Sequence, residues 1–468
     1  MRTIFFSFSA EPVWKTLFFF EGSVCEKLAA WTRRNPEARV IFVMPTGYAG
    51  KYGEGLQKHL HERCGIAHIP FIKKQTFLER SFRFFYSYFV YTGTTRIMAT
   101  IGIRPDEPPG GGPFKKYLGP LKWLISRTFG RSDFFRKVFV PYFYYHVFRG
   151  RPFQELFEKY KPDLIFASNI INQFDTALVA EAKRQGVPTM GMSTNWDHYD
   201  KYYLPMQTDT LLVQSDQMKD FAIRYQWYDP KCLSLTGYPH LDFVSREGHT
   251  LSRAEVLEGL RLPPDARYIV YASSSAYCKD EPDIIEEILK WIAEKRLPQN
   301  LYVVIRPYAG VRKWDREVEE EKFDRFEGYS HARIFRGQFW GDAQKSNFSM
   351  NVLHKADVVL AVYTTMAIEA AVLGRPLIAP TFDGYAGKRP FSKSVRRFAI
   401  REHFRDVVKT GALKPAYTFD QLYTYLSEYL KDPMLDAEKR QALIERVCYL
   451  TDGNASERIF QRIQKSIL

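Results

Sequence analysis

Several features that would point to other kinds of protein are scarce or missing in this sequence. No apolar run reaches the roughly 20 residues that a membrane-spanning helix requires. The opening residues are typical of a first strand and lack the cleavage site of a signal peptide. Walker, GxGxxG, GxSxG and DxD motifs do not occur in a convincing context. The cysteines are scattered, odd in number and without a CxxC pair: Cys25, Cys64, Cys232, Cys278 and Cys448. This pattern argues against disulfides or a zinc site and indicates a cytoplasmic protein without a bound metal.

Acidic residues are also in deficit. The chain has 67 lysines and arginines against 53 aspartates and glutamates, which gives a formal net charge of +14. This imbalance predicts an anionic partner such as a phosphorylated substrate, phospholipid headgroups or nucleic acid. The 468 residues are too many for one core and indicate two domains of roughly 200 residues each.

Alternating strand and helix patterns indicate an α/β fold in both halves of the chain. Residues 1–245 form the predicted N-terminal domain and residues 246–468 the predicted C-terminal one, whose last helix is a candidate to pack back on the first. The pattern changes between Ile72 and Tyr160, where phenylalanine and tyrosine interleave with lysine and arginine. We expect a helical insert there.

The most informative stretch is Ala356–Gly384. A short apolar run is typical of a strand buried on both faces of a parallel sheet, and a helix follows it after the turn Tyr363–Thr365. Free amides at such a helix N-terminus are suited to hold a phosphate. Thr364 or Thr365 is the expected N-cap, and Glu369 lies one turn inside, near where a ribose would lie. An ordinary βαβ unit with a capped helix is the alternative.

A hydroxyl pair followed by E-A-x-x-x-G-x-P resembles the donor-nucleotide motif in the C-terminal domain of GT-B glycosyltransferases and their epimerase relatives. The resemblance implies two Rossmann-like domains facing a cleft, with the nucleotide sugar held by the C-terminal one. Within this family the donor contacts fall on the following positions: Ser273, Ser274, Ser275, Arg306, Phe339, Trp340, Tyr363, Thr364, Thr365, Glu369, Asp383 and His403. Asp383 and His403 belong to a stretch that resembles a poorly characterised bacterial group of this fold.

Each donor position has a structural alternative. Local capping in a turn is the alternative for the serines, and a surface ion pair is the alternative for Arg306. Core packing is the alternative for Phe339 and Trp340, and a surface or capping role is the alternative for His403.

Candidates for the chemistry lie in the first domain. Asn195, Trp196 and Asp197 directly follow a predicted strand, where similar GT-B-like proteins carry a W-D pair. A carboxylate there would accept the proton of an acceptor hydroxyl, so Asp197 is the first candidate base, followed by Asp175 and then Glu11. Asn195 and Trp196 are the candidate acceptor contacts. A turn whose polar side chains bond their own backbone is the alternative.

The aromatic and basic residues of the insert fit a membrane surface better than nucleic acid, because no RNA-binding signature accompanies them. Internal packing of an aromatic helical subdomain is the alternative. The resulting prediction is a metal-independent glycosyltransferase without a cofactor, peripheral at the cytoplasmic face of the membrane. It uses a UDP-, CMP- or GDP-linked sugar and a surface polysaccharide or lipid-linked glycan as acceptor. A nucleotide-sugar 2-epimerase or a polyol-phosphate transferase of the same fold is an alternative, and so is a non-catalytic basic protein that binds membrane or nucleic acid.

Overall fold

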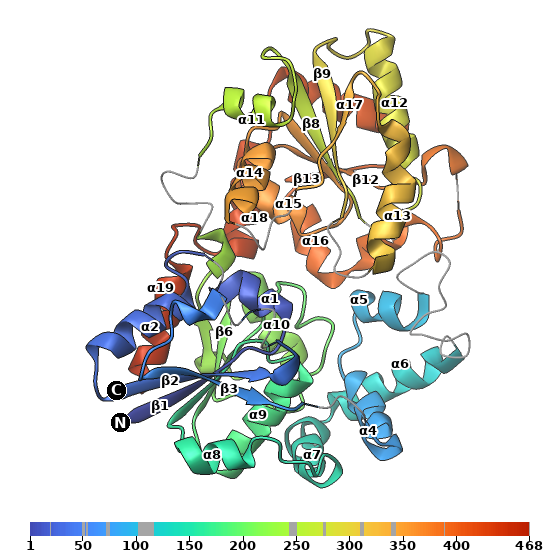
Figure 1. Cartoon of the computed structure of the whole chain (residues 1–468). Coiled ribbons are helices and arrows are strands. Elements are labelled where there is room, and N and C mark those ends of the chain that lie inside the picture. Colours follow the sequence, from blue (N-terminus) through green and yellow to red (C-terminus); the bar gives the residue numbers. More distant parts are fainter. Residues whose placement is uncertain are drawn as a thin grey trace. The chain divides into compact units, whose positions relative to one another are not determined.

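The computed structural model describes residues 1–18, 20–48, 52, 55–71, 75–101, 117–242, 250–274, 278–308, 313–337, 343–387 and 389–467. The chain divides into two compact units (Figure 1). Unit 1 consists of Met1–Thr95, Gly119–Ser245 and Cys448–Leu468, and unit 2 of Arg96–Leu118 and Arg246–Val447. Three of the residues predicted to contact the donor, Ser275, Phe339 and Trp340, lie outside the described residues.

Unit 1 is built on a parallel sheet of seven described strands. In spatial order they are β3 (Cys64–Ile69), β2 (Ala38–Pro45), β1 (Arg2–Ser7), β4 (Leu164–Ala167), β5 (Thr189–Met192), β6 (Thr210–Val213) and β7 (Leu233–Leu235). Successive side chains of a strand point to opposite faces, and β1 shows the consequence. Ile4 and Phe6 join the core on one face, while Phe5 joins a second core on the other face.

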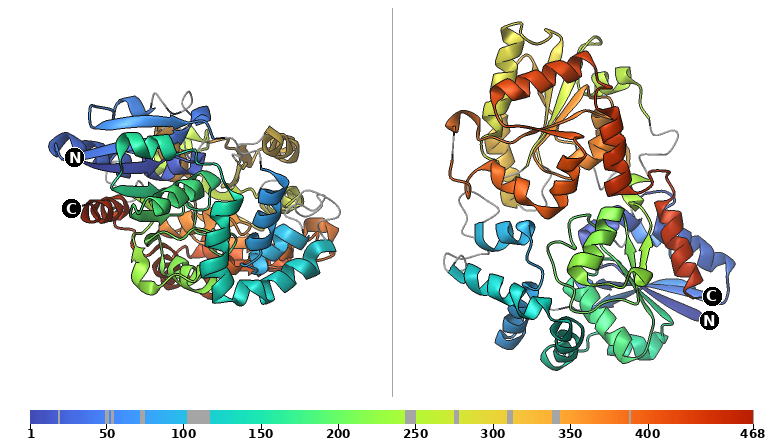
Figure 2. Two further views of the ribbon diagram at one scale, coloured as in Figure 1. Left: turned by 90° about the horizontal axis from the view of Figure 1, so that it is seen from below. Right: turned by 180° about the vertical axis from the view of Figure 1, so that it is seen from behind.

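The helices of unit 1 include some that cover the two faces of this sheet and others that pack in a separate cluster without any strand residue. In chain order they are α1 (Glu11–Val13), α2 (Val24–Arg34), α4 (Phe77–Ser87), α5 (Gly93–Arg96), α6 (Gly119–Arg127), α7 (Val140–Val147), α8 (Gln154–Tyr160), α9 (Gln173–Arg184), α10 (Asp216–Gln226) and α19 (Ala455–Lys465). The C-terminal helix α19 lies beside α2 and adds Ile459, Ile463 and Ile467 to the first core (Figures 1 and 2). The chain therefore returns to unit 1 to complete it.

Unit 2 has a parallel sheet of six described strands. In spatial order they are β10 (Ala332–Ile334), β9 (Leu301–Arg306), β8 (Arg267–Ala272), β11 (Val358–Ala361), β12 (Leu377–Pro380) and β13 (Leu413–Ala416). Its helices are α11 (Arg253–Gly259), α12 (Glu281–Ala293), α13 (Lys313–Phe323), α14 (Ala343–His354), α15 (Met366–Val372), α16 (Glu402–Lys409), α17 (Phe419–Lys431) and α18 (Ala437–Cys448). The prediction of two doubly wound α/β sheets is confirmed.

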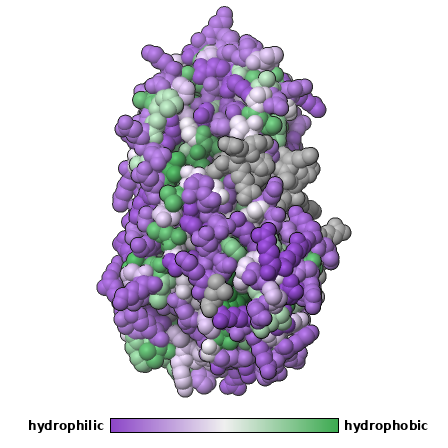
Figure 3. Space-filling view, turned by 90° about the vertical axis from the view of Figure 1, so that its left-hand side faces the viewer, coloured by the Kyte–Doolittle hydropathy of each residue, from purple (hydrophilic) through white to green (hydrophobic). Residues whose placement is uncertain are grey.

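None of the described helices combines the length and apolar character needed to cross a lipid bilayer. On the face drawn in Figure 3, hydrophilic residues predominate and hydrophobic residues form small, separate patches. The large apolar side chains of the two sheets lie instead in the cores, as the continuous apolar strands predict.

Candidate functional site

The predicted donor residues of unit 2 converge on one edge of its sheet. Because β8, β9, β11 and β12 are parallel, their carboxyl ends meet at the same edge. Ser273 and Ser274 follow β8, Arg306 is the last residue of β9, and Tyr363–Thr365 follow β11. Asp383 follows β12. Open parallel sheets bind their ligands at this edge, so the placement favours a binding site.

Two buried ionisable side chains of opposite type interact electrostatically there. Arg306 and Glu369 are 8% and 7% exposed, and each acts electrostatically on the other. Burial lowers the pKa of Arg306 to about 10 and raises that of Glu369 to about 7, although Arg306 pulls the latter down. The Glu369 Oε2 atom has no hydrogen-bond partner among the described residues. A buried acceptor left in this state costs about 1–3 kcal/mol, which points to a ligand group as its partner.

The turn between β11 and α15 is strained. Tyr363 has a φ of 36°, in the left-handed region that a bulky residue rarely adopts. Its ring packs 5.3 Å from that of Phe404 on α16, which helps to hold this conformation. The Thr364 hydroxyl is buried and has no partner among the described residues. Backbone strain of this kind concentrates at functional sites, where it orients particular groups.

Thr365 is the residue that precedes α15, but its hydroxyl does not cap the helix and its backbone is already helical. The expected capping hydrogen bond is therefore wrong. The predicted roles of Tyr363, Thr364, Thr365 and Glu369 in donor binding stay predictions.

The hydroxyl groups of Ser273 and Ser274 are bonded within the protein. Ser273 donates to Glu281 at 3.0 Å, and Ser274 donates to the carbonyl of Val362 at 3.2 Å. These bonds agree with the alternative of a locally capped turn, and the donor contact stays a prediction. Ser274 also offers its amide to Glu281 at 2.9 Å, so Glu281 fixes the loop after β8 from the first turn of α12.

Sequence reasoning missed the charge cluster behind this loop. Lys322 on α13 forms ion pairs with Glu281 and Glu319, at 2.5 and 3.1 Å, and all three side chains are buried. Burial lowers the pKa of Lys322, but the two glutamates outweigh it and the net shift is upward. Glu319 also accepts from the amide of Tyr308 at 2.6 Å, so the cluster ties together the loops after β8 and β9. The acidic first turn of α12 was the available signal.

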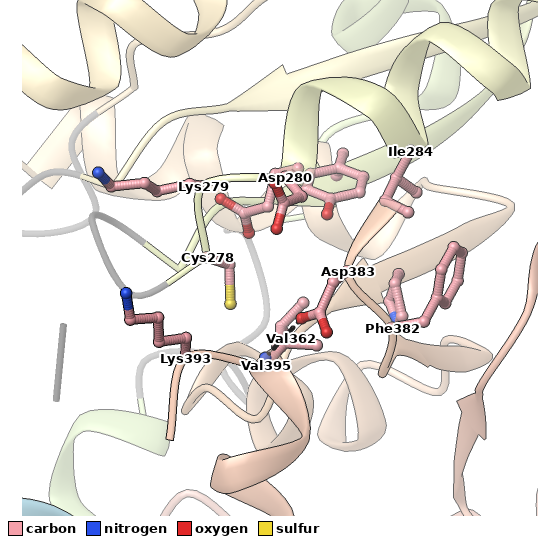
Figure 4. A pocket seen from close by; sticks show the side chains of 12 residues that line it. Cys278, Lys279, Asp280, Ile284, Val362, Phe382, Asp383, Lys393 and Val395 are labelled. Carbon is pink, nitrogen blue, oxygen red and sulfur yellow. Dashed lines mark hydrogen bonds between the residues drawn. The ribbon is translucent and has the colours of Figure 1, made fainter. Parts of the chain in front are cut away.

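Asp383 borders a pocket between α12 and the loop after β12 (Figure 4). Its Oδ1 accepts from the amide of Val395 at 2.9 Å, whereas its Oδ2 has no partner among the described residues. Lys279 and Lys393 lie along one side of the pocket, and the Cys278 thiol points into it. Burial raises the pKa of Cys278 well above its usual range, so this thiol stays neutral and is not a nucleophile.

His403 lies on α16 and is 1% exposed, with its ring 4.9 Å from that of Phe404. It is therefore packed inside unit 2, and its predicted contact with the donor stays a prediction.

In unit 1 the three candidate bases follow different strands at the carboxyl edge. Asp197 follows β5 and forms an ion pair with Lys201. Glu11 begins α1 and lies 3.8 Å from Lys15. Asp175, on α9, is fully buried and accepts from Ser7. Burial raises the pKa of Asp175 to about 6, although hydrogen bonds from Ser7 and neighbouring groups lower it.

The neighbour of Asp197 was missed by sequence reasoning. His198 is 8% exposed; its Nδ1 lies 2.5 Å from the hydroxyl of Ser193, and its Nε2 lies 3.3 Å from the amide of Asn195 and 3.9 Å from Asp197. An imidazole held between a hydroxyl and a carboxylate is a second candidate base. Trp196 is 3% exposed, so its ring is covered by protein, and its role as an acceptor contact stays a prediction.

Among the described residues, no group of three or more histidine, cysteine, aspartate or glutamate side chains is arranged to hold a metal ion. Residues 330–465 match the sequence model of the CDP-glycerol:poly(glycerophosphate) glycerophosphotransferase family. The matched segment contains the turn after β11, Glu369, Asp383 and His403. No curated protein matches the sequence of the chain.

Solved structures match nearly the whole chain. A putative UDP-N-acetylglucosamine 2-epimerase from Listeria monocytogenes has a TM-score of 0.54 at 14% identity, over 99% of this chain and 96% of that one. A UDP-GlcNAc 2-epimerase from Neisseria meningitidis bound to UDP-GlcNAc has a TM-score of 0.55 at 11% identity, over 99% and 100%. The glycotransferase of kitacinnamycin has a TM-score of 0.51 at 13% identity, over 100% and 99%. The chain has the GT-B fold.

The charge of Glu369 provides a test of this candidate site through stability. Folding raises the Glu369 pKa from 4.5 to about 7, so the folded state favours the neutral carboxyl. The resulting loss of stability is absent below about pH 4.5 and grows as the pH rises to about 7. Glu369→Gln mimics the neutral form. We expect it to be as stable as the parent at pH 4.5 and more stable by about 1–3 kcal/mol at pH 8, measured by urea unfolding.

The control is Glu258→Gln on the exposed face of α11. This variant should follow the parent at both pH values. Equal differences between Glu369→Gln and the parent at pH 4.5 and pH 8 would contradict the buried, neutral carboxyl.

Proposed function

We propose that the chain transfers a sugar from a nucleotide-linked donor to a hydroxyl of a surface polysaccharide or lipid-linked glycan, without a metal ion. The observation that carries the proposal is the pair of buried ionisable side chains at the carboxyl edge of unit 2. Arg306 supplies a cation for the donor diphosphate, and the unpartnered Glu369 Oε2 is an acceptor for the ribose hydroxyls. Thr364 adds a second unpartnered group in the same turn region.

Besides a donor site, the proposed reaction needs groups that stabilise the leaving diphosphate and a base that takes the acceptor proton. The acceptor oxygen attacks the anomeric carbon, the bond from that carbon to the diphosphate breaks, and a base takes the acceptor proton. Arg306 and the amides of the turn stabilise the charge that develops on the leaving diphosphate. Unit 1 supplies the base, with Asp197 the first candidate and His198 the second.

Polyol-phosphate transfer is the second candidate, because residues 330–465 match a family described as glycerophosphotransferases. In that reaction the acceptor oxygen attacks phosphorus, and the nucleoside monophosphate leaves. The donor that reacts and the nucleotide that it releases together separate the candidates. Sugar transfer releases UDP, GDP or CMP from the corresponding nucleotide sugar, and glycerophosphate transfer releases CMP from CDP-glycerol. Epimerisation with hydrolysis releases UDP without any acceptor.

The decisive experiment incubates the protein with UDP-, GDP- and CMP-linked sugars and with CDP-glycerol, and follows nucleotide release by chromatography. We expect acceptor-dependent release of a nucleoside diphosphate from one sugar donor, unaffected by EDTA. Glu369→Gln should weaken binding of that nucleotide by about 1.5–3 kcal/mol, the scale of a charge-assisted hydrogen bond, while Glu258→Gln leaves it unchanged. CMP release from CDP-glycerol alone would establish the second candidate, and binding of no nucleotide would reject both.

Replacing the candidate bases tests the other half of the mechanism. Asp197→Asn keeps the shape of the side chain and removes its basicity, so we expect turnover to fall by roughly 10²–10⁴ while nucleotide binding persists. His198→Gln is the matched comparison. If His198→Gln abolishes turnover and Asp197→Asn retains it, the imidazole is the base. If Asp197→Asn also loses nucleotide binding, its role is structural.

The helices α4, α6 and α7 are the proposed contact with an anionic membrane surface. Large apolar side chains of these helices and of the π-helical segment Phe134–Phe139 before α7 are at least half exposed: Phe77, Leu78, Trp123, Leu124, Phe134, Val138 and Tyr142. Between residues 119 and 147 the chain has five lysines and arginines but one acidic residue, Asp133. Aromatic rings and cations together suit the headgroup region of a bilayer.

The test is sedimentation with vesicles of phosphatidylcholine, with or without phosphatidylglycerol. We expect binding to the anionic vesicles and release as salt rises, because salt screens headgroup attraction. Leu124→Ala combined with Phe134→Ala should lower this binding about tenfold, since each removes apolar area from the contact. The control combines Tyr417→Ala with Met434→Ala, which are similarly exposed in unit 2. Equal binding to neutral vesicles, or stronger binding to RNA, would contradict the proposal.

A further inference from the structure

A row of buried polar side chains follows four neighbouring strands of unit 1. The strands β1, β4, β5 and β6 are adjacent and parallel, so the segments that leave them lie next to one another. Five polar side chains of these segments are at most 5% exposed: Ser9, Asn169, Asp175, Thr194 and Gln214. We call this set the polar row.

Three residues of the polar row carry a side-chain oxygen without a hydrogen-bond partner among the described residues. These oxygens are Asn169 Oδ1, Thr194 Oγ1 and Gln214 Oε1. The orientation of Gln214 is fixed, because its amide nitrogen donates to the carbonyl of Ser193. Ser9 and Asp175 complete the row, and the hydroxyl groups of Ser7 and Ser9 donate hydrogen bonds to the Asp175 carboxylate. Native proteins rarely leave buried polar atoms unpaired, and three along one sheet edge indicate a binding function.

The chemistry of these atoms restricts the ligand. The two amide oxygens only accept hydrogen bonds, and the Thr194 hydroxyl accepts or donates. A ligand must therefore present several donors. A phosphate near neutral pH offers mainly acceptors and is repelled by a carboxylate, whereas each hydroxyl group of a sugar or polyol offers one donor.

We propose that the polar row binds a neutral sugar or polyol through its hydroxyl groups. The inference rests on the proposed function in one respect, since it identifies this ligand as the hydroxyl-bearing end of the acceptor. Unit 1 thereby recognises hydroxyl groups, while the buried cation Arg306 and the carboxyl of Glu369 make unit 2 suited to a nucleotide. Asp175 is held by hydrogen bonds from Ser7 and Ser9 and serves as a positioning residue.

The surroundings of Asp175 fit this role. Ser7 bridges Asp175 and Ser168, with 2.9 Å between the two serine oxygens, and the amide of Ser168 donates to Ser7 at 2.8 Å. These bonds hold one carboxylate oxygen, and Ser9 also donates a hydrogen bond to the carboxylate. The α9 N-terminus is capped separately by Asn172, so Asp175 is not required as the cap.

Two threonines of unit 1 provide a matched test. The Thr194 hydroxyl is unpartnered among the described residues, whereas the hydroxyl of Thr176, which is also buried, donates to the carbonyl of Asn172 at 2.9 Å. Threonine to valine keeps the shape and removes the hydroxyl in both cases. Binding is measured by saturation-transfer NMR with N-acetylglucosamine, glucose, ribitol and glycerol, each up to 100 mM, and stability by the melting temperature without ligand.

We expect the full-length protein to bind at least one of these probes. Thr194→Val should weaken that binding about fivefold or more and leave the melting temperature unchanged or higher, because a buried unpaired hydroxyl is removed. Thr176→Val should bind the probe like the parent and should not raise the melting temperature. Asn169→Leu should repeat the behaviour of Thr194→Val.

Three results would overturn the proposal. The first is that no probe binds the parent, and the second is that Thr194→Val binds the probe like the parent. The third is a lower melting temperature for Thr194→Val together with weaker binding, which would make the hydroxyl structural. Binding of UDP to the same samples, followed by thermal shift, separates the two hypotheses. If a probe binds and no nucleotide binds, the proposed function is rejected but sugar binding by the polar row is not. If a nucleotide binds and no probe binds, sugar binding by the polar row is rejected but the proposed function is not.

Discussion

The parallel arrangement of both sheets is the constraint on which the rest of the structure depends. Every named strand pair is parallel, so each strand must be followed by a crossover, and all carboxyl ends collect at one edge. Large apolar side chains pack between helices and the faces of each sheet. Polar groups therefore collect at the carboxyl edge. Buried charge and strain in unit 2 gather at that edge, where Arg306 ends β9 and Tyr363 follows β11.

The two edges differ in chemistry. Unit 2 places a buried cation near a carboxyl group and fixes the adjoining loops by the cluster of Lys322, Glu281 and Glu319. Unit 1 places mostly uncharged hydrogen-bonding groups there, with Asp175 as the one carboxyl of the polar row. A charged edge suits a phosphorylated donor, and a neutral edge suits hydroxyl groups. We propose that unit 2 binds the nucleotide and unit 1 the hydroxyl groups because of this difference in charge, since both units share the same fold.

Stability and binding compete at these positions. Glu369 and Thr194 keep buried oxygens without a partner among the described residues, and each lowers the stability of the folded state. Lys322 shows the opposite case, because both of its carboxylate partners are in place. Lys322 thus stabilises the loops at the edge, whereas Glu369 and Thr194 each have an oxygen that a ligand can bind under the proposals above.

The sequence alone determined the architecture and most of the candidate donor site of this protein. Apolar strands such as Val358–Ala361 and the turn Tyr363–Thr365 are local patterns, and strand order in a parallel α/β fold brings their ends together. Only the tertiary structure decided which polar groups are satisfied. Ser273 and Ser274 bond within the protein, Glu369 interacts electrostatically with Arg306, and Thr194 remains unpaired among the described residues, because these outcomes depend on side chains far apart in the chain.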